Sequence, residues 1–396
     1  MDYLLSRHPI FRPKMDVIGY EVRTRAVGEK SAGTPDAERS MFSMLSDTRL
    51  DQIVGSHSCF INVTPEALAE GLWKKIPADK IVLCYLNDFA PEDAVAQELL
   101  KLARSGSRVV LSGQLNPQSL ELFADRAPVL KLDVTSIAPE DLEKKFAELR
   151  RYKVPLLAGS VDTYDDLEFC QSLGFDLYEG RFIARSASHE EKQIPVNRLT
   201  MMRVLSQLQD PELSLPDLEK TISLDAALSY KLLSYSNSAA VSLPRKVSSV
   251  GHAVRLIGVN LLRTWTSVLL LSSVDDKPRE LMTISLVRAR MCELLSESLK
   301  NAQKDAFFSA GLLSVIDALL DCPMEKAVAH LPLVDEVKSA LIDRSGPVGQ
   351  ALRCAIAYEN ADWDNVQFYG MAPAPIREAY MESIAWARQL SSGLLS

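Results

Sequence analysis

The chain has 396 residues, of which 47% are hydrophobic and 24% are charged, and its formal net charge is −8. This length and composition can bury sizeable cores and predict two domains, whereas the net negative charge argues against broad electrostatic binding of nucleic acid. The start "MDYLLSRHPI" lacks the features of a secretory signal, and the longest apolar segment, "LLRTWTSVLLLSSV", contains an arginine and is too short to span a membrane.

Short β-rich runs alternate with helical stretches before about residue 190. The β-rich runs are "IGYEVRTR", "CFINV", "KIVLCYL", "RVVLSGQ", "PVLKLDV", "VPLLAGSV" and "FDLYEG", and "EDAVAQELLKLARSG" and "PEDLEKKFAELRRYK" have helical patterns. Alternation of this kind predicts a parallel sheet covered by helices. The number of units in roughly 185 residues favours a (β/α)8-type barrel over an open sheet.

The segment "SASHEEKQIPVNR" has the composition of a polar linker, and the chain after it is almost wholly helical in pattern. We therefore predict an α/β plus all-α protein with a barrel over 1–186, a linker over 187–198 and a helical domain over 199–396. In the helical part, Ser249 is predicted to cap the start of a helix that Gly258 ends.

Candidate functional residues follow from the predicted barrel, because chemistry in this fold belongs to the carboxyl ends of the strands. A carboxylate at such an end, as at Glu21 in "YEVRTR", has two interpretations: it holds a metal, or it is a solvated strand end. The strand ends carry Glu21, Asn62, Cys84 to Asn87, Ser112, Gly113, Lys131, Asp133, Gly159 and Glu179.

The segments "HPIF…VIGYEVRTR", "FINVTPE", "IVLCYLND", "VVLSGQ", "VLKLDV", "LLAGSVDT" and "GFDLYEGRFIARS" carry a resemblance to a known family. Together they resemble the EAL domains, the cyclic di-GMP phosphodiesterases, over 1–186. The resemblance implies a barrel that binds two divalent cations, with a lysine that assists the attacking water. It implies that Glu21 and Asn62 are metal ligands, that Lys131 is the catalytic lysine and that Asp133 is the aspartate two residues on.

Several positions depart from the family's pattern and remove metal ligands. Hydrolysis with two metals needs several hard oxygen ligands to keep the cations together. We therefore predict that the barrel is catalytically inactive, that Glu21, Asn62, Lys131 and Asp133 are remnants, and that it holds no metal or other cofactor. The departures are Cys84 or Tyr85 for a Glu, Ser112 and Gly113 for two Asp residues, Gly159 for a Glu, and Glu179 for a Gln.

Nucleotide binding without hydrolysis is a separate question. Arg25 falls where the family has a phosphate-contacting arginine, and Arg25, Arg185 and Glu179 are the candidates for nucleotide binding. Against retained binding, His8 replaces a family Gln, and Arg23 stands where the signature has Leu. The alternative is a remnant strand end with solvated arginines, since a charge cluster alone is weak evidence for a site.

The helical half contains "LDAALSYKLLSYSNSAAVSLPRKVSSVGHAVRLIGVNLLRTW", Leu224 to Trp265, which resembles the HDOD family, metal-free relatives of the HD phosphohydrolases. The resemblance implies an HD-superfamily-like helical domain that serves as a regulatory or partner-binding module. Ser314 and Val315 stand where the superfamily has its His-Asp pair. We therefore predict no second metal hydrolase, and a hydrogen-bonded or core role for His252.

The predicted function is that of a non-enzymatic adaptor that binds protein partners in bacterial cyclic di-GMP signalling and influences motility, attachment or biofilm formation. Two alternatives stay open: a cyclic di-GMP sensor without hydrolysis, and a residual phosphodiesterase. The six cysteines show no CxxC spacing, so reduced thiols and a cytoplasmic location are expected. The partner is not identified by the sequence, and a homodimer stays open.

Overall fold

The computed structural model divides into two compact units, which we describe separately as the barrel unit and the helical unit. The barrel unit comprises 1–183, 357–366 and 371–378, and the helical unit comprises 184–356, 367–370 and 379–396. The structure describes residues 3–27, 35–45, 50–86, 89–112, 117–123, 129–186, 204–205, 207–208, 214–237, 246–271, 274, 277–300, 302–329, 331 and 333–394.

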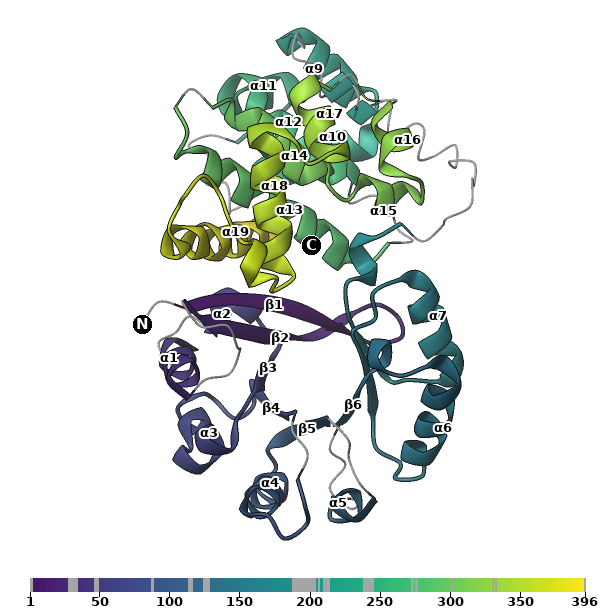
Figure 1. The fold of residues 1–396 in the computed structure, drawn as a ribbon. Coiled ribbons are helices and arrows are strands. Elements are labelled where there is room, and N and C mark those ends of the chain that lie inside the picture. The colour runs from purple at the N-terminus through teal and green to yellow at the C-terminus, as the bar shows by residue number, and fades with distance from the viewer. Residues whose placement is uncertain are drawn as a thin grey trace. The chain divides into compact units, whose positions relative to one another are not determined.

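Eight strands close into a barrel in chain order, β1 to β8 (Figure 1). Neighbouring strands from β2 to β8 are parallel, as predicted, whereas β1 is antiparallel to both β2 and β8. The sequence analysis did not predict β1. The strands are β1 (Tyr3–Phe11), β2 (Val17–Ala26), β3 (Ser58–Asn62), β4 (Ile81–Tyr85), β5 (Arg108–Ser112), β6 (Val129–Asp133), β7 (Leu156–Gly159) and β8 (Leu177–Glu179).

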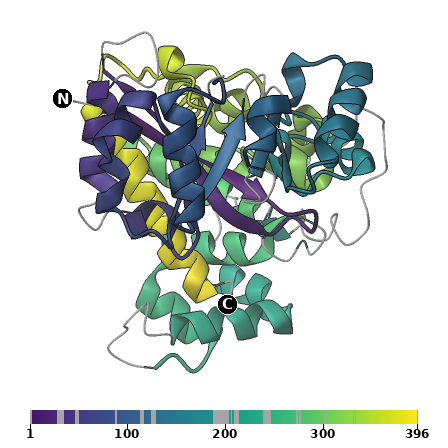
Figure 2. The same cartoon turned by 90° about the horizontal axis from the view of Figure 1, so that it is seen from below.

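The β1–β2 hairpin is longer than the rest of the sheet. Its strands have 9 and 10 residues, and the hairpin is the long purple ribbon of Figure 2. The turn is closed by a backbone hydrogen bond of 2.8 Å from Met15 to Arg12, with Met15 in the left-handed region at φ 62°. An ion pair of 2.9 Å between Arg12 and Asp16 spans the same turn.

Helices lie outside the barrel strands (Figure 1), and local sequence explains where several begin. The Thr64 side chain accepts a hydrogen bond from the Ala67 amide at the start of α3, and Thr163 and Asp166 form a reciprocal capping box at α7. The barrel unit contains α1 (Pro35–Met44), α2 (Leu50–Val54), α3 (Pro65–Glu70), η2 (Leu72–Lys75), α4 (Ala94–Arg104), α5 (Pro117–Glu121), η3 (Val134–Ser136), α6 (Pro139–Arg150), α7 (Tyr164–Leu173), η4 (Phe182–Ala184, which ends at the unit boundary) and η5 (Trp363–Asn365).

Apolar side chains from six strands form a buried core cluster in the barrel unit. The interior of a barrel of this size is therefore a packed core, and polar chemistry is confined to its ends. The cluster consists of Ile10, Phe60, Val82, Cys84, Val110, Leu157 and Leu177.

The helical unit is all-helical in its described residues, as predicted. Ser249 caps α11 by accepting a hydrogen bond from the His252 amide, and Gly258 ends that helix with φ 89°. The helices are α9 (Leu215–Ser223), α10 (Ala226–Ser236), α11 (Val250–Ile257), α12 (Val259–Leu271), α13 (Arg279–Ser296), α14 (Lys304–Leu313), α15 (Ile316–Leu320), α16 (Met324–Ala329), α17 (Asp335–Ile342), α18 (Gly346–Glu359) and α19 (Pro373–Leu394), and the last two contribute residues to both units.

Residues near the carboxyl terminus form part of the barrel unit. The Leu5 amide donates a hydrogen bond of 3.3 Å to the Tyr358 hydroxyl, and Arg377 Nη1 donates one of 3.2 Å to the Tyr3 carbonyl. These bonds tie β1 to segments that are more than 350 residues away in the chain. The predicted linker 187–198 lies outside the described residues, so the predicted domain boundaries stay predictions.

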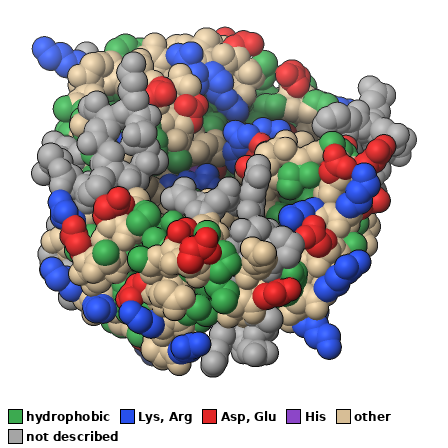
Figure 3. All heavy atoms as spheres, turned by 60° about the horizontal axis from the view of Figure 1, so that its bottom comes forward, with side chains coloured by type: hydrophobic (Ala, Val, Ile, Leu, Met, Phe, Trp, Pro, Cys, Tyr) green, Lys and Arg blue, Asp and Glu red, His purple; other side chains and the backbone are tan. Residues whose placement is uncertain are grey.

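On the face drawn in Figure 3, Lys and Arg side chains are visible in a central hollow, and acidic and basic side chains are both scattered over the rest of that face. All six cysteines are buried and free. Within the described part of the chain, no helix is both long enough and apolar enough to cross a membrane.

Candidate functional site

A cluster of charged side chains lies at one end of the barrel, and we call it the rim cluster: Glu21, Arg23, Asn62, Lys131 and Glu179. Glu21 and Arg23 are two residues apart on β2, so they point to the same side of the strand. Arg23 Nε donates a hydrogen bond of 3.1 Å to Glu21 Oε1, and its Nη2 donates one of 2.9 Å to Glu179 Oε1. One arginine therefore bridges two carboxylates.

Lys131 on β6 contacts the same two carboxylates. Its Nζ donates to Glu21 Oε2 and lies 3.2 Å from Glu179 Oε2. Space for this side chain comes from Gly159, because a Cβ atom there would lie 2.5 Å from Lys131 Cε. The absence of a side chain at Gly159 thus leaves room for the lysine.

The charges of the rim cluster stabilise one another. Burial opposes ionisation of Glu21, but the charges of Lys131 and Arg23 and the Lys131 hydrogen bond outweigh burial and lower the Glu21 pKa well below its usual value. Burial likewise opposes the charge on Lys131, but Glu179 and Glu21 raise its pKa. Glu21 therefore stays ionised and Lys131 stays protonated near neutral pH, and the formal charges of the cluster sum to zero.

Two oxygens of the rim cluster fit a divalent cation. Asn62 Oδ1 is buried and accepts no hydrogen bond from the residues that the structure describes, and the only contact of buried Glu179 Oε2 among them is its ion pair with Lys131. Asn62 Nδ2 donates a bond of 3.4 Å to Glu21 Oε1, which places the amide beside the carboxylates. Carboxylate and amide oxygens are the ligands that Mg²⁺ and Ca²⁺ prefer. Two carboxylates and one amide oxygen suit one cation that keeps several waters, although no three His, Cys, Asp or Glu side chains of the described chain gather as ligands.

Asp133 lies near the rim cluster but is bonded elsewhere. It is exposed, and its Oδ1 accepts hydrogen bonds from the Thr135 amide at 3.2 Å and the Thr135 hydroxyl at 2.9 Å, which caps η3. Burial opposes a raised pKa of Arg23, but the charges of Glu21 and Glu179 outweigh burial and raise that pKa. The charge of Asp133 makes a smaller contribution in the same direction. The structure thus assigns Asp133 a capping role and a long-range electrostatic effect on the cluster.

Arg25 follows Arg23 by two residues on β2 and contacts the segment from the carboxyl-terminal region. Its Nη1 donates a hydrogen bond of 2.7 Å to Asp364 Oδ1, with the Arg25 side chain 15% exposed and the Asp364 side chain 86% exposed. Arg185 is exposed and belongs to the helical unit, so its predicted position beside the nucleotide stays a prediction.

His8 lies opposite Glu21 in the β1–β2 register. Burial and the charge of Arg23 lower its pKa well below the usual value, so its imidazole is neutral near pH 7. Its Nε2 lies 3.0 Å from the Ser6 hydroxyl. His8 and Arg23 were not predicted as members of the site, although the spacing of Glu21, Arg23 and Arg25 already puts these three residues on one side of β2.

The other strand-end positions supply no charged group to the rim cluster. Cys84 and Tyr85 are buried, and burial raises the pKa of the Cys84 thiol, so it stays protonated. Ser112 lies opposite Lys131 in the β5–β6 register. Gly113 lies outside the described residues.

The helical unit contains the positions that were compared with HD hydrolases. Ser314 Oγ donates a hydrogen bond of 2.7 Å to the Gly311 carbonyl and accepts one of 3.2 Å from Arg288 Nη1. Burial raises the pKa of Asp317. His252 Nδ1 accepts a bond of 3.4 Å from the Ser248 amide. Ser314 and His252 thus have structural partners, and neither forms part of a His-Asp pair.

Comparison with known proteins gives three findings. Residues 194–341 match the model of the HDOD domain. Over 98% of this chain, the sequence is 28% identical to the cyclic di-GMP phosphodiesterase CdgJ of Vibrio cholerae, of which 93% is covered, and 25% identical to YuxH of Bacillus subtilis, of which 99% is covered. The Bacillus subtilis protein YkuI, solved with an EAL domain in complex with cyclic di-GMP and calcium, is 17% identical with a TM-score of 0.36 over 65% of this chain and 73% of that one.

The prediction of a non-enzymatic, catalytically inactive adaptor is contradicted by these findings, because CdgJ, a relative along almost the whole chain, is named a phosphodiesterase. The prediction was wrong because it counted ligands that match the family's pattern position by position. That count treated Glu179 as a loss, whereas the structure places it against Arg23 and Lys131, beside the remaining ligands.

The predicted order of domains is confirmed. The closed eight-stranded barrel occupies the amino-terminal part and the HDOD match lies within the helical part. The predicted fold class, a closed barrel followed by a helical domain, is thus confirmed.

Proposed function

We propose that the barrel unit is a cyclic di-GMP phosphodiesterase whose reaction takes place at the rim cluster. The observation that carries this proposal is the pair of buried carboxylates, Glu21 and Glu179, held beside Lys131 and an amide oxygen of Asn62 that accepts no hydrogen bond from any described residue. The name of the relative CdgJ supports the substrate and the reaction.

The protonation states limit the role of each side chain. The lowered pKa of Glu21 makes it a weak base, so it is suited to bind cations and not to remove a proton from water. Lys131 stays protonated, and its ammonium group can donate a hydrogen bond to the attacking water or to a phosphoryl oxygen. Arg23 and Arg25 supply planar, permanently charged donors for phosphate oxygens.

Glu21, Glu179 and Asn62 are the residues that would hold one divalent cation. Such a cation supplies polarisation of the phosphoryl group and a lower pKa for bound water. Because the rim cluster is neutral as a whole, an added divalent charge needs compensation, and the two phosphates of a cyclic dinucleotide provide it. Lys131 and Arg23 must give up part of their ion pairs with Glu21 and Glu179 when cation and nucleotide bind together.

The experiment incubates the full chain with cyclic di-GMP and Mg²⁺ or Mn²⁺ and follows the linear dinucleotide by chromatography. Glu21→Gln and Glu179→Gln should each lower the rate by about 100-fold or more, because each removes a carboxylate from the cluster. Glu140→Gln is the matched control, since Glu140 is an exposed carboxylate on α6 outside the cluster. Its rate should equal that of the wild type.

The proposal would be refuted if folded protein formed no linear dinucleotide with either Mg²⁺ or Mn²⁺. Equal rates for Glu21→Gln and the wild type would place the reaction elsewhere. The predicted cytoplasmic location, protein partners and homodimer stay predictions, and the proposed reaction depends on none of them.

A further inference from the structure

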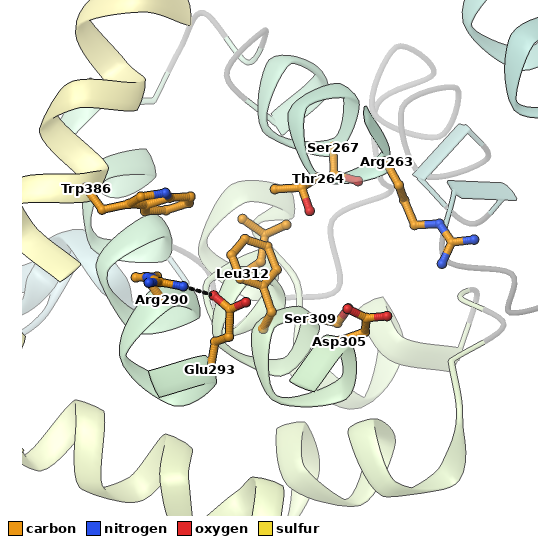
Figure 4. Close-up of a pocket in the computed structure, with 10 residues that line it drawn as sticks. Arg263, Thr264, Ser267, Arg290, Glu293, Asp305, Ser309, Leu312 and Trp386 are labelled. Atoms are coloured by element: carbon orange, nitrogen blue, oxygen red, sulfur yellow. Dashed lines mark hydrogen bonds and ion pairs between the residues drawn. The ribbon is translucent and has the colours of Figure 1, made fainter. Parts of the chain in front are cut away.

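A cavity of about 280 Å³ lies within the helical unit, between side chains of α12, α13, α14 and α19 (Figure 4). Its wall is mixed in character. An aromatic side chain, Trp386, stands at one end, and Arg263 stands at the opposite end of the view. Hydroxyl groups of Thr264, Ser267 and Ser309 line the space between them, together with the carboxylate of Asp305. Trp386 and Arg263 therefore occupy different ends of one cavity.

The apolar end is an aromatic corner. The rings of Phe308 and Trp386 meet edge to face, with centroids 6.0 Å apart and an interplanar angle of 87°. Both side chains line the cavity, and Leu312 extends the apolar wall. A flat ring that enters such a corner packs on one ring face and meets the edge of the other, a geometry that aromatic groups prefer.

Arg290 at the aromatic end is fixed by two carboxylates. Its Nη1 donates a hydrogen bond of 2.7 Å to Glu293, and its Nη2 donates one of 2.6 Å to Glu382. Its Nε is buried and has no hydrogen-bond partner within the described chain. A buried donor without a partner costs free energy unless a ligand or water satisfies it. This part of the wall is thus built with hydrogen-bonding capacity that the protein itself does not use.

We propose that this cavity binds a purine nucleoside monophosphate. The base lies in the aromatic corner of Phe308 and Trp386, where the carboxylate of Glu293 can accept hydrogen bonds from N–H groups of the base. The phosphate lies at the other end, beside Arg263. Base and phosphate are at opposite ends of a mononucleotide, as the aromatic corner and Arg263 are at opposite ends of the cavity.

Size and charge select this class of ligand. Pockets for drug-sized ligands measure about 300–1,000 Å³, so this cavity of about 280 Å³ lies near the lower limit, which favours a small ligand such as a mononucleotide. A neutral sugar would make use of the aromatic wall but not of Arg263. An aliphatic anion would use Arg263 but not the aromatic corner. A small anion with a flat ring uses both ends.

The test is isothermal calorimetry on the full chain with GMP and AMP as probes and guanosine as the uncharged comparison. At least one nucleotide should bind with a Kd of about 1–100 μM, and guanosine should bind at least about tenfold more weakly. Arg263→Gln should weaken nucleotide binding by about tenfold or more, and Arg263→Lys should retain part of the affinity. Arg353→Gln is the charge-matched control, because Arg353 is exposed on α18 and does not line the cavity.

Trp386→Phe keeps an aromatic wall and should weaken binding less than Trp386→Leu does, which separates a stacking role from misfolding. Lys131→Met in the barrel should leave nucleotide binding unchanged, so failure of this inference and failure of the phosphodiesterase proposal are distinguishable. No heat with either nucleotide at millimolar concentration would overturn the inference. So would binding that Lys131→Met abolishes and Arg263→Gln does not, or equal affinities for guanosine and GMP.

Discussion

Replacing Lys131 by methionine tests whether the rim cluster is held by charge balance. The Lys131 side chain is 11% exposed and contacts Glu21 and Glu179, whose side chains are 4% and 2% exposed. Methionine keeps most of the length of the side chain but removes its charge. Two buried carboxylates would then share only Arg23. Loss of one partner from a buried ion pair typically destabilises a protein by about 3–5 kcal/mol.

Protonation sets an upper limit on this electrostatic penalty. The variant can always neutralise one Glu carboxyl, and with an ordinary pKa of about 4.3 this costs about 1.4 kcal/mol for each pH unit above that value. The limit is therefore about 4 kcal/mol at pH 7.5 and about 2 kcal/mol at pH 5.5. In the variant, the raised pKa of one carboxyl means that stability is lost as pH rises. In the wild type, the lowered pKa of Glu21 means that its contribution is lost as pH falls below about 4.5.

The assay is urea unfolding of both proteins at pH 7.5 and pH 5.5. The difference in the free energy of unfolding should be larger at pH 7.5, where it can reach about 4 kcal/mol, than at pH 5.5, where it should not exceed about 2 kcal/mol. The double variant Lys131→Met with Glu179→Gln removes the excess negative charge and should recover most of the stability at pH 7.5. A penalty of equal size at both pH values, or no recovery in the double variant, would refute charge balance as the organising feature of the cluster.

Three further predictions follow from other contacts. Gly159→Ala should lower the proposed hydrolysis rate by at least about tenfold, because the new Cβ displaces the end of Lys131 that pairs with Glu21 and Glu179, and in urea unfolding it should destabilise the protein less than Lys131→Met does, because the charge of Lys131 is kept. Asp364→Asn should strengthen cyclic di-GMP binding in calorimetry by releasing Arg25, at a stability cost within about 0.5 kcal/mol, as expected for an exposed ion pair. Burial raises the pKa of Glu38 to about 7, so the contribution of its neutral carboxyl to stability is lost as pH rises toward 7. Glu38→Gln should therefore be more stable than the wild type at pH 8, by on the order of 1–3 kcal/mol, but not at pH 5. Thermal or urea unfolding of both proteins measures this difference.

The parallel strands of the barrel could be predicted because their apolar runs are local signals. The first strand, Tyr3–Phe11, could not, because its centre carries Ser6, Arg7 and His8, all of which are buried. Their burial depends on partners that are distant in sequence. Arg7 Nη1 donates a hydrogen bond of 2.6 Å to the Ile53 carbonyl, and the guanidinium lies 4.4 Å from the centre of the Tyr20 ring. No pattern within the strand itself indicates these contacts.

The meeting of Glu21, Asn62 and Lys131 could also be expected from sequence, since the carboxyl ends of parallel strands lie at one end of a barrel. The ion pairs that form at this end of the barrel could not be expected from the sequence. Arg23 and Glu179 are 156 residues apart in the chain, and their ion pair depends on the antiparallel placement of β1 between β2 and β8. That placement is a property of the closed sheet and not of either segment.

A count of ligands against a family pattern assumes that each position acts alone, whereas a buried site must also balance its charge. In the rim cluster the loss of acids at the middle strands is accompanied by cations that reach the remaining acids: Arg23 at a position where the signature has Leu, and Lys131 in the space that Gly159 leaves. Two carboxylates and two cations can stay buried together because each neutralises the other. Activity therefore depends on the free-energy cost of replacing the ion pairs of Lys131 and Arg23 with contacts to a metal ion and a phosphate. That cost is set by contacts between strands, so neither a motif nor a missing ligand reveals it.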